Sequence, residues 1–90
     1  MPRNKKPRTC GCTFRGKAFK PTGIPMSEVR QIVLSRDELE TLRLCDLKDL
    51  TQEEAGDKMG ISRGTVQRIL SEARKKVAKS LVEGSALVFE

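Results

Sequence analysis

Apolar residues recur every three or four positions through the second half of the chain, which is the spacing of one face of a helix. Three stretches with this spacing each follow a serine or threonine, whose hydroxyl can accept hydrogen bonds from the free amides of a first helical turn. The pattern therefore predicts three helices, which begin after Ser35, Thr51 and Ser62.

The first predicted helix opens with Ser35 three residues before Glu38, the spacing of a reciprocal capping box. Thr51 and Glu54 repeat this spacing at the start of the second helix. The inward-facing residues of the first helix are predicted to be Leu39, Leu42 and Leu47, with Leu44 or Cys45 beside them.

The second predicted helix is short and ends at Gly60, because glycine favours the left-handed conformation that closes many helices. The third runs from Ser62 to Gly84, which is about 20 residues or ~30 Å of helix. Its inward face is predicted to hold Val66, Ile69, Leu70, Ala73, Val77 and Leu81.

Residues 52–70 match the pattern of a helix-turn-helix. The two helices of this motif cross at close range, so the first helix needs a small residue where they cross. The turn needs a conformationally permissive residue, and the corner needs an apolar residue that fills the space between the helices. Gly56, Gly60 and Ile61 fill these three positions. An ordinary helical hairpin with a glycine in its turn is the alternative, but the match in spacing as well as composition favours the helix-turn-helix.

The outward-facing residues at the start of the third helix are predicted to enter the major groove of double-stranded DNA. Arginine suits a bidentate contact with guanine and glutamine one with adenine, each worth about 1–3 kcal/mol of discrimination. Glycine lets the backbone approach the DNA closely. The predicted reading residues are Arg63, Gly64, Thr65, Gln67 and Arg68, with Arg68 suited equally to a base or a phosphate.

Hydroxyls and free amides at helix N-termini can bind phosphate oxygens, so Ser62 and Thr51 are predicted phosphate contacts. Four basic residues follow further along the third helix, where the helix dipole favours positive charge in any case. We interpret them as mainly structural, with phosphate contact as the second option. They are Arg74, Lys75, Lys76 and Lys79.

The distribution of charge fits a phosphate-facing surface. The formal net charge is +6, with +7 over residues 1–30, −4 over residues 31–60 and +3 over residues 61–90. The two ends therefore attract polyanions while the middle repels them. An N-terminal arm is predicted to follow the DNA backbone or to enter a minor groove through Arg3, Lys5, Lys6 and Arg8.

The regions that flank the helices are irregular. Residues 1–26 hold all four prolines, which interrupt regular structure, and form a basic arm. Residues 28–34 suit a short strand or an extended entry into the helices, and residues 85–90 an apolar tail that is either a short edge strand or a dimer contact. The predicted fold is all-α: a three-helix helix-turn-helix domain over residues 27–84, with a long third helix.

The three cysteines leave a second interpretation open. A reducing compartment disfavours disulfides, and a zinc site normally needs four ligands, whereas this chain has three thiols and no histidine. No cofactor is expected unless Cys10 and Cys12 bind a metal with a further ligand, or act as a redox pair. Cys45 is predicted to be a small buried apolar residue.

Several classes of protein are excluded or disfavoured. The absence of histidine excludes histidine-based catalysis, and no nucleophile–base pair, phosphate loop or metal-spaced carboxylate cluster indicates an enzyme. No apolar run approaches the roughly 18 residues of a membrane span, and no hydrophobic segment follows the basic N-terminus. The protein is therefore predicted to be cytoplasmic and not membrane-bound.

The chain also resembles, over nearly its whole length, a family of small prokaryotic proteins of largely unknown function to which DNA binding is ascribed. The resemblance is carried by the opening Met-Pro-Arg with its basic run, and by residues 19–25, 37–44, 52–55 and 62–76. The helical part is similar to region 4 of bacterial sigma factors, a helix-turn-helix that reads promoters. The resemblance implies a transcription regulator.

The same resemblance adds two expectations. Relatives often carry alanine where this chain has Gly56, which implies a helix looser by roughly 0.5–1 kcal/mol. Some relatives are linked to proteins of the dinitrogenase iron–molybdenum cofactor type, which favours a metal-linked signal.

We therefore expect a sequence-specific regulator that binds DNA as a homodimer. The third helix is longer than the motif needs, and Val77, Leu81 and residues 87–89 lack partners in so small a core, so a symmetric copy would cover them. The alternatives are a sigma-like adaptor that contacts RNA polymerase or another protein, and a metal- or redox-responsive switch at Cys10 and Cys12.

Overall fold

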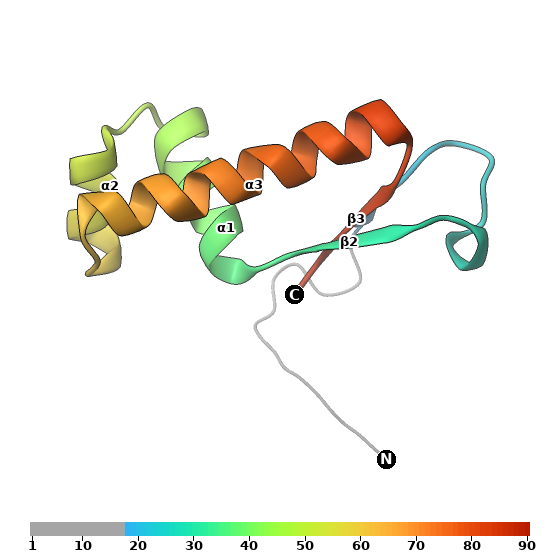
Figure 1. Ribbon diagram of the computed structural model, residues 1–90, viewed down its shortest axis with the longest axis horizontal. Helices are drawn as coiled ribbons and strands as arrows, with labels where there is room; N and C mark the ends of the chain where they lie inside the picture. Colours follow the sequence, from blue (N-terminus) through green and yellow to red (C-terminus); the bar gives the residue numbers. More distant parts are fainter. Residues whose placement is uncertain (1–17) are drawn as a thin grey trace, which may run out of the picture.

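The computed structural model describes residues 18–90, so the predicted arm contacts Arg3, Lys5, Lys6 and Arg8 and the pair Cys10 and Cys12 lie outside the described residues. The described part is mostly helical, with a small three-stranded sheet at one end (Figure 1). Its elements in chain order are β1 (Ala18–Phe19), the 3-10 helix η1 (Met26–Glu28), β2 (Gln31–Leu34), α1 (Arg36–Thr41), the π-helix η2 (Leu42–Leu47), α2 (Gln52–Met59), α3 (Arg63–Glu83) and β3 (Ala86–Phe89).

The three predicted helix starts are confirmed. Reciprocal bonds join Ser35 to Glu38 and Thr51 to Glu54, in each case with the hydroxyl 3.1 Å from the amide and the carboxylate 2.8 Å from the cap amide. The Ser62 hydroxyl caps α3 in the same way but without a returning carboxylate. Each helix therefore begins where local hydrogen-bond chemistry satisfies its free amides.

The first helix changes its pitch after Thr41. The chain continues as the π-helix η2, in which a backbone amide donates to the carbonyl five residues earlier. This wider turn shifts the face of the helix on which the later residues lie. Leu44 is buried, but Leu47 is 72% exposed, so the prediction that Leu47 faces inward is wrong. The wider turn is the reason, because the prediction assumed an unbroken α-helical period.

The sheet corrects the all-α prediction. β3 lies in the middle, antiparallel to β1 and parallel to β2, so the C-terminal tail is a central strand and not an edge strand. Parallel strands need a long crossover between them, and here α1, α2 and α3 supply it. Residues 28–34 contribute β2, one of the two options that the sequence left open.

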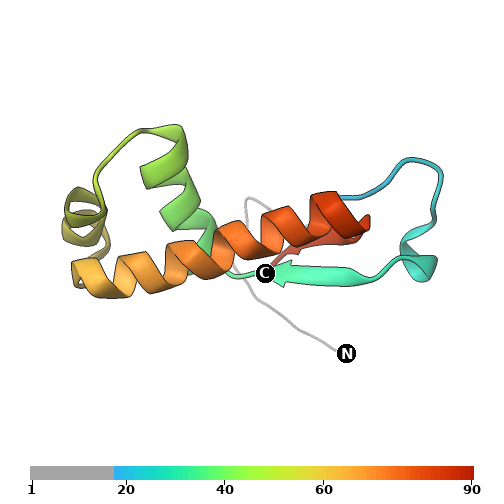
Figure 2. The same ribbon diagram turned by 45° about the horizontal axis from the view of Figure 1, so that its top comes forward.

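The long helix α3 connects the two ends of the molecule. Near its N-terminus Val66 is fully buried in a core with Leu44 and Ala55, and further along Leu70 and Ala73 are buried as well. Figure 2 shows α3 running from α2 at one end to the sheet at the other. α3 packs against α1, α2, β2 and β3, so its position is fixed along its whole length.

An ion pair joins three of these elements. The ammonium of Lys76 on α3 lies 2.7 Å from Oε1 of Glu38 on α1 and donates to the Val33 carbonyl of β2 at 2.8 Å. Burial alone would raise the pKa of the Glu38 carboxyl, but the bonds from Lys76 and Ser35 outweigh it and hold the pKa below the ordinary 4.5. Because the charged form is favoured in the fold, the pair stabilises it above about pH 4.5.

Replacing Glu38 with glutamine is therefore expected to lower the free energy of unfolding by about 1–3 kcal/mol at pH 7, the range for hydrogen bonds to charged groups. The difference should shrink as the pH falls below 4.5 and the wild-type carboxyl takes up its proton. Urea unfolding at pH 7 and pH 3.5 measures it. Glu40→Gln is the control, since Glu40 pairs with Arg43 at the surface, where ion pairs contribute about 1 kcal/mol or less. Equal effects of the two substitutions would contradict the role of Glu38.

Candidate nucleic-acid interface

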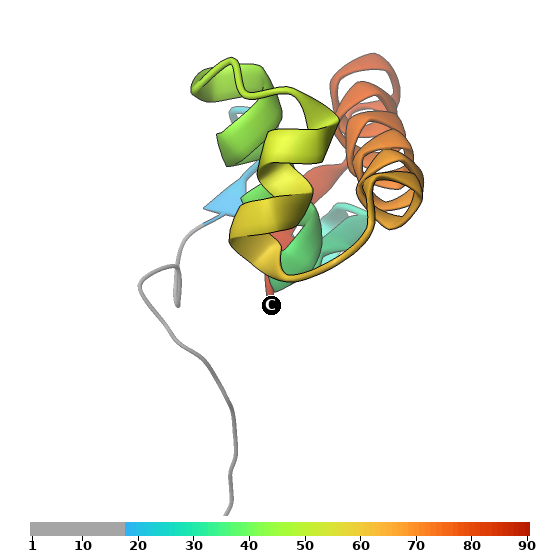
Figure 3. The ribbon, with the colours of Figure 1, turned by 90° about the vertical axis from the view of Figure 1, so that its left-hand side faces the viewer.

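The candidate site lies at the N-terminal end of α3, where a three-residue turn, 60–62, joins it to α2. Gly60 ends α2 with φ 74°, in the left-handed region, and the Ile61 amide donates to the Gly56 carbonyl at 3.0 Å. Figure 3 views this end directly, with α2 in front of α1 and beside the first turns of α3. The turn is thus short and hydrogen-bonded at both of its ends.

The turn packs closely against α2 at Gly56. A Cβ added to this glycine would lie 2.6 Å from the Ile61 carbonyl oxygen and 3.5 Å from Cγ2 of Val66. Real Cβ atoms do not approach a backbone oxygen so closely. The resemblance implied only that glycine loosens α2, whereas the geometry adds that glycine permits the contact between α2, the turn and α3.

The predicted reading residues lie on the surface. Arg63, Gly64, Gln67 and Arg68 are exposed and Thr65 is half-buried. Within residues 18–90, the side chains of Arg63, Gln67 and Arg68 make no hydrogen bond or ion pair. Their polar groups are therefore available to a binding partner.

Gly64 has open space on its outer side, since an added Cβ would meet nothing within 4 Å. The backbone is therefore bare at this position, one residue after Arg63 and three before Gln67. A flat or grooved partner could approach the helix most closely here.

The N-termini of α2 and α3 differ in charge. The first turn of α3 holds no acidic residue, whereas the first turn of α2 holds Glu53 and Glu54. The hydroxyls of Thr51 and Ser62 already accept a bond from their own helix, and that of Ser62 also lies 2.9 Å from the Thr65 hydroxyl. An anion is consequently favoured at the start of α3 more than at the start of α2.

Most of the basic residues further along α3 form ion pairs with acidic residues of the same chain. Besides the Lys76 pair described above, Arg74 binds Asp46 of η2 at 2.6 Å and Lys79 approaches Glu83 at 3.7 Å. The hydrogen bond from Arg74 lowers the pKa of the Asp46 carboxyl below its ordinary value. These contacts agree with the structural interpretation of the cluster. Lys75 differs, because it is exposed and has no ion pair in the described part of the chain.

Two features were not foreseen from the sequence. The partners Glu38 and Lys76 stand 38 residues apart, and no local pattern links them. The apolar spacing predicts that Leu81 faces inward, but Leu81 is 80% exposed, because Ser80 and not Leu81 occupies the buried side at the end of the helix. Its neighbour Val82 is 83% exposed.

The structure also bears on metal and membrane binding. Among residues 18–90, no three histidine, cysteine or acidic side chains gather where a metal ion could be held. Cys45 is a half-buried free thiol whose pKa is raised by burial and by Asp46, against the opposing effect of Arg74. No helix in this region has both the length and the apolar character that a bilayer crossing requires.

Comparison with known proteins identifies relatives but no activity. The family described as "Protein of unknown function DUF134" matches residues 1–90. A UPF0251 protein of Vibrio vulnificus strain CMCP6 is 53% identical over 97% of this chain and 87% of its own length. A UPF0251 protein of Halothermothrix orenii is 53% identical over 80% of this chain and 53% of its own length. No solved structure matches.

Proposed function

The chain belongs to the DUF134 family of proteins of unknown function, and we propose that it binds double-stranded DNA sequence-specifically and regulates transcription at the sites it binds. In this proposal α2, the turn over residues 60–62 and α3 act as a helix-turn-helix. The first turns of α3 enter the major groove.

The observation that carries the proposal is a set of exposed polar side chains without hydrogen-bond partners in the described region, which surround Gly64, where no side chain covers the backbone. Arg63, Gln67 and Arg68 are exposed, make no bond within the described region, and surround Gly64, where nothing blocks a close approach. The rest of α3 is held by packing and by ion pairs, so these side chains project from a rigid support. Rigid presentation lowers the entropic cost of binding.

Each residue then has a role set by its chemistry. Arg63 donates two hydrogen bonds to a guanine, and Gln67 pairs with an adenine through its amide. Arg68 contacts a base or a phosphate, and the Ser62 hydroxyl and the free amides of the first turn of α3 bind a phosphate. Thr51 contributes through its hydroxyl alone, because Glu53 and Glu54 repel phosphate at that end.

The test begins with selection of bound duplexes from a random pool, followed by affinity measurements at several salt concentrations. Arg63→Ala and Arg68→Ala are each expected to weaken binding to the selected site by about 10- to 100-fold, the equivalent of ~1–3 kcal/mol. Arg36→Ala and Lys48→Ala are matched controls, since both residues are exposed, basic and free of side-chain bonds within residues 18–90. They should change affinity by less than about threefold, as expected of charges outside the interface.

Two results would contradict the proposal. If the Arg63 and Arg68 variants bind as well as the wild type, α3 is not the reading element. If no duplex is enriched and the wild type shows no salt-dependent affinity for DNA, the adaptor interpretation replaces DNA binding.

A further inference from the structure

The outer face of α3 carries two polar side chains beyond the reading residues. Ser71 and Lys75 follow Gly64 by 7 and 11 residues, which is close to two and three whole turns, so all three lie on one face of the helix. Both side chains are exposed, and within residues 18–90 neither makes a hydrogen bond or an ion pair. Because residues four apart are neighbours on a helix surface, this hydroxyl and this ammonium lie next to each other.

Lys75 stands between two basic residues that are tied to the rest of the fold. Arg74 pairs with Asp46 of η2. Lys76 pairs with Glu38 of α1. These two pairs compensate the charges on either side of Lys75 and hold the backbone that carries it. Over residues 73–78, the positive charge left without an acidic partner is therefore that of Lys75, and a rigid helix presents it to solvent.

The position of this pair along α3 favours the DNA backbone over the bases. From Gly64, which lies nearest the groove floor in the proposed complex, Ser71 is ~10.5 Å and Lys75 ~16.5 Å further along the helix. The major groove is ~12 Å wide, so both positions lie near or beyond its edge, where the phosphates are. A lysine ammonium also suits a phosphate as a point charge, whereas arginine gives the bidentate contact that reads guanine.

We propose that Ser71 and Lys75 form a site for one phosphate of the DNA backbone, an inference that rests on the proposed function. The Lys75 ammonium donates to a phosphate oxygen and compensates its charge, and the Ser71 hydroxyl donates to the same phosphate. A phosphate contact carries no sequence information, but it fixes the register of the protein on the duplex. The positions of Arg63 and Gln67 against the base edges then depend on it.

A carboxylate limits the site on one flank. Glu72 is exposed and follows Ser71 directly, so its side chain projects ~100° further round α3. In the part of the chain that the structure describes, Glu72 forms no ion pair, and its charge repels a phosphate on its own side of the helix. The phosphate therefore binds on the Ser71 side of Lys75.

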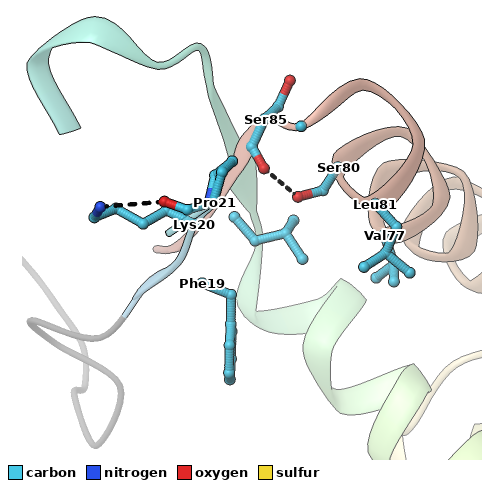
Figure 4. A pocket seen from close by; sticks show the side chains of 9 residues that line it. Phe19, Lys20, Pro21, Val77, Ser80, Leu81 and Ser85 are labelled. Carbon is cyan, nitrogen blue, oxygen red and sulfur yellow. Dashed lines mark hydrogen bonds between the residues drawn. The ribbon is translucent and has the colours of Figure 1, made fainter. Parts of the chain in front are cut away.

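The helix becomes apolar beyond this site. Val82 lies on the same outer face and is 83% exposed. The groove at this end of α3, seen from close by in Figure 4, is lined mostly by apolar side chains, and its Ser80 hydroxyl already donates to the Ser85 carbonyl. The Lys79 ammonium approaches Glu83 at 3.7 Å. A phosphate is therefore less favoured here, and the phosphate-binding stretch of α3 ends at the proposed site.

The test measures the affinity of the full chain for the selected duplex and for a random duplex at several salt concentrations. Each phosphate contact contributes about 0.9 to the slope of log K against log salt. Lys75→Gln is therefore expected to make the slope less steep by about 0.9 on both duplexes, so that its loss of affinity is ~3.5 times larger at 50 mM than at 200 mM salt. Ser71→Ala should weaken binding by about 2- to 12-fold, the range for one hydrogen bond, and leave the slope unchanged, because a hydroxyl carries no charge.

Uncharged linkages in the DNA locate the phosphate. Each phosphate of the selected duplex is replaced in turn by a neutral methylphosphonate. At the linkage bound by Lys75 the wild type should lose affinity, whereas Lys75→Gln should lose none of its charge contact, because that contact is already absent. Lys79→Gln is the matched control, since Lys79 is basic and one turn further along α3 but is paired with Glu83. It should keep both the slope and the linkage dependence of the wild type.

Three results would overturn the phosphate site and leave the proposed function in place. Lys75→Gln could keep the wild-type slope, or it could lose affinity for the selected duplex alone, as a residue that reads a base would. Lys79→Gln could flatten the slope as much as Lys75→Gln does, in which case a general positive field accounts for both losses. The proposed function fails by a different result, a wild type that shows no salt-dependent affinity for any duplex.

Discussion

Replacing Gly56 with valine is expected to lower the free energy of unfolding by about 3 kcal/mol or more, and replacing it with alanine by about 1–2 kcal/mol. The added Cβ would lie 2.6 Å from a backbone oxygen, that of Ile61, which cannot rotate away as a flexible side chain would. Alanine recovers up to ~1 kcal/mol of helix propensity, so the net loss is smaller than the clash. Valine adds methyl groups toward Val66, which is already fully buried.

Thermal and urea unfolding followed by circular dichroism measure both substitutions. For a chain of this size, each kcal/mol corresponds to about 4–8 °C in Tm, so the valine variant should melt at least ~12 °C below the wild type. Gly64→Ala is the control, because it makes the same change on α3 where no atom lies within 4 Å. It should leave stability unchanged or raise it by up to ~1 kcal/mol. If the Gly56→Ala variant is as stable as the wild type, the turn does not lie as close to α2 as the 2.6 Å from the added Cβ to the Ile61 oxygen implies.

The sequence predicted the features of this fold that depend on neighbouring residues. The helices begin at Ser35, Thr51 and Ser62, whose hydroxyls accept hydrogen bonds from amides three residues later. Two of the helices end at Gly60 and Gly84, which adopt the left-handed conformation. Such interactions involve residues a few positions apart, so a pattern in the chain is enough to reveal them.

The features that the sequence did not predict depend on residues far apart in the chain. β3 pairs with β2 in a register that places Gln31 opposite Ala86. No feature of either short sequence indicates that the two strands pair. The two strands meet in the folded chain, where α3 packs on both of them. The sequence does not indicate the π-helix η2 for a different reason, since a single wide turn leaves the apolar residues close to an α-helical spacing.

The exposure of the residues at the start of α3 is easier to predict than the exposure of Leu81 near its end. Outward-facing residues follow directly from helical period once Val66 and Leu70 are assigned inward, and the structure leaves Arg63, Gln67 and Arg68 exposed. Whether Leu81 is buried, by contrast, depends on which residues in the last turns of α3 pack against the rest of the fold, and these include Ser80 rather than Leu81. The exposure of Leu81 therefore required coordinates.

Replacing Gly64 with leucine is expected to weaken binding to the selected DNA site by about 10- to 100-fold without destabilising the protein, because the loss of one or two base contacts costs ~1–3 kcal/mol each. In the free protein the new side chain meets open space, and leucine favours a helix more than glycine does. In the complex it would stand between the backbone and the floor of the groove, and would move Arg63 and Gln67 away from the base edges.

Alanine and leucine at position 64 form a graded series, in which affinity falls with side-chain size while the free energy of unfolding stays level or rises. Ala78→Leu is the control on the same exposed face, 14 residues and ~21 Å further along α3, which is beyond the reach of a major groove about 8.5 Å deep. Affinity measured by fluorescence anisotropy on the selected duplex, with stability measured in parallel, separates binding from folding. If Gly64→Leu binds DNA as tightly as the wild type, the backbone of α3 does not approach the groove here. The reading residues would then have to be sought on another face of the molecule.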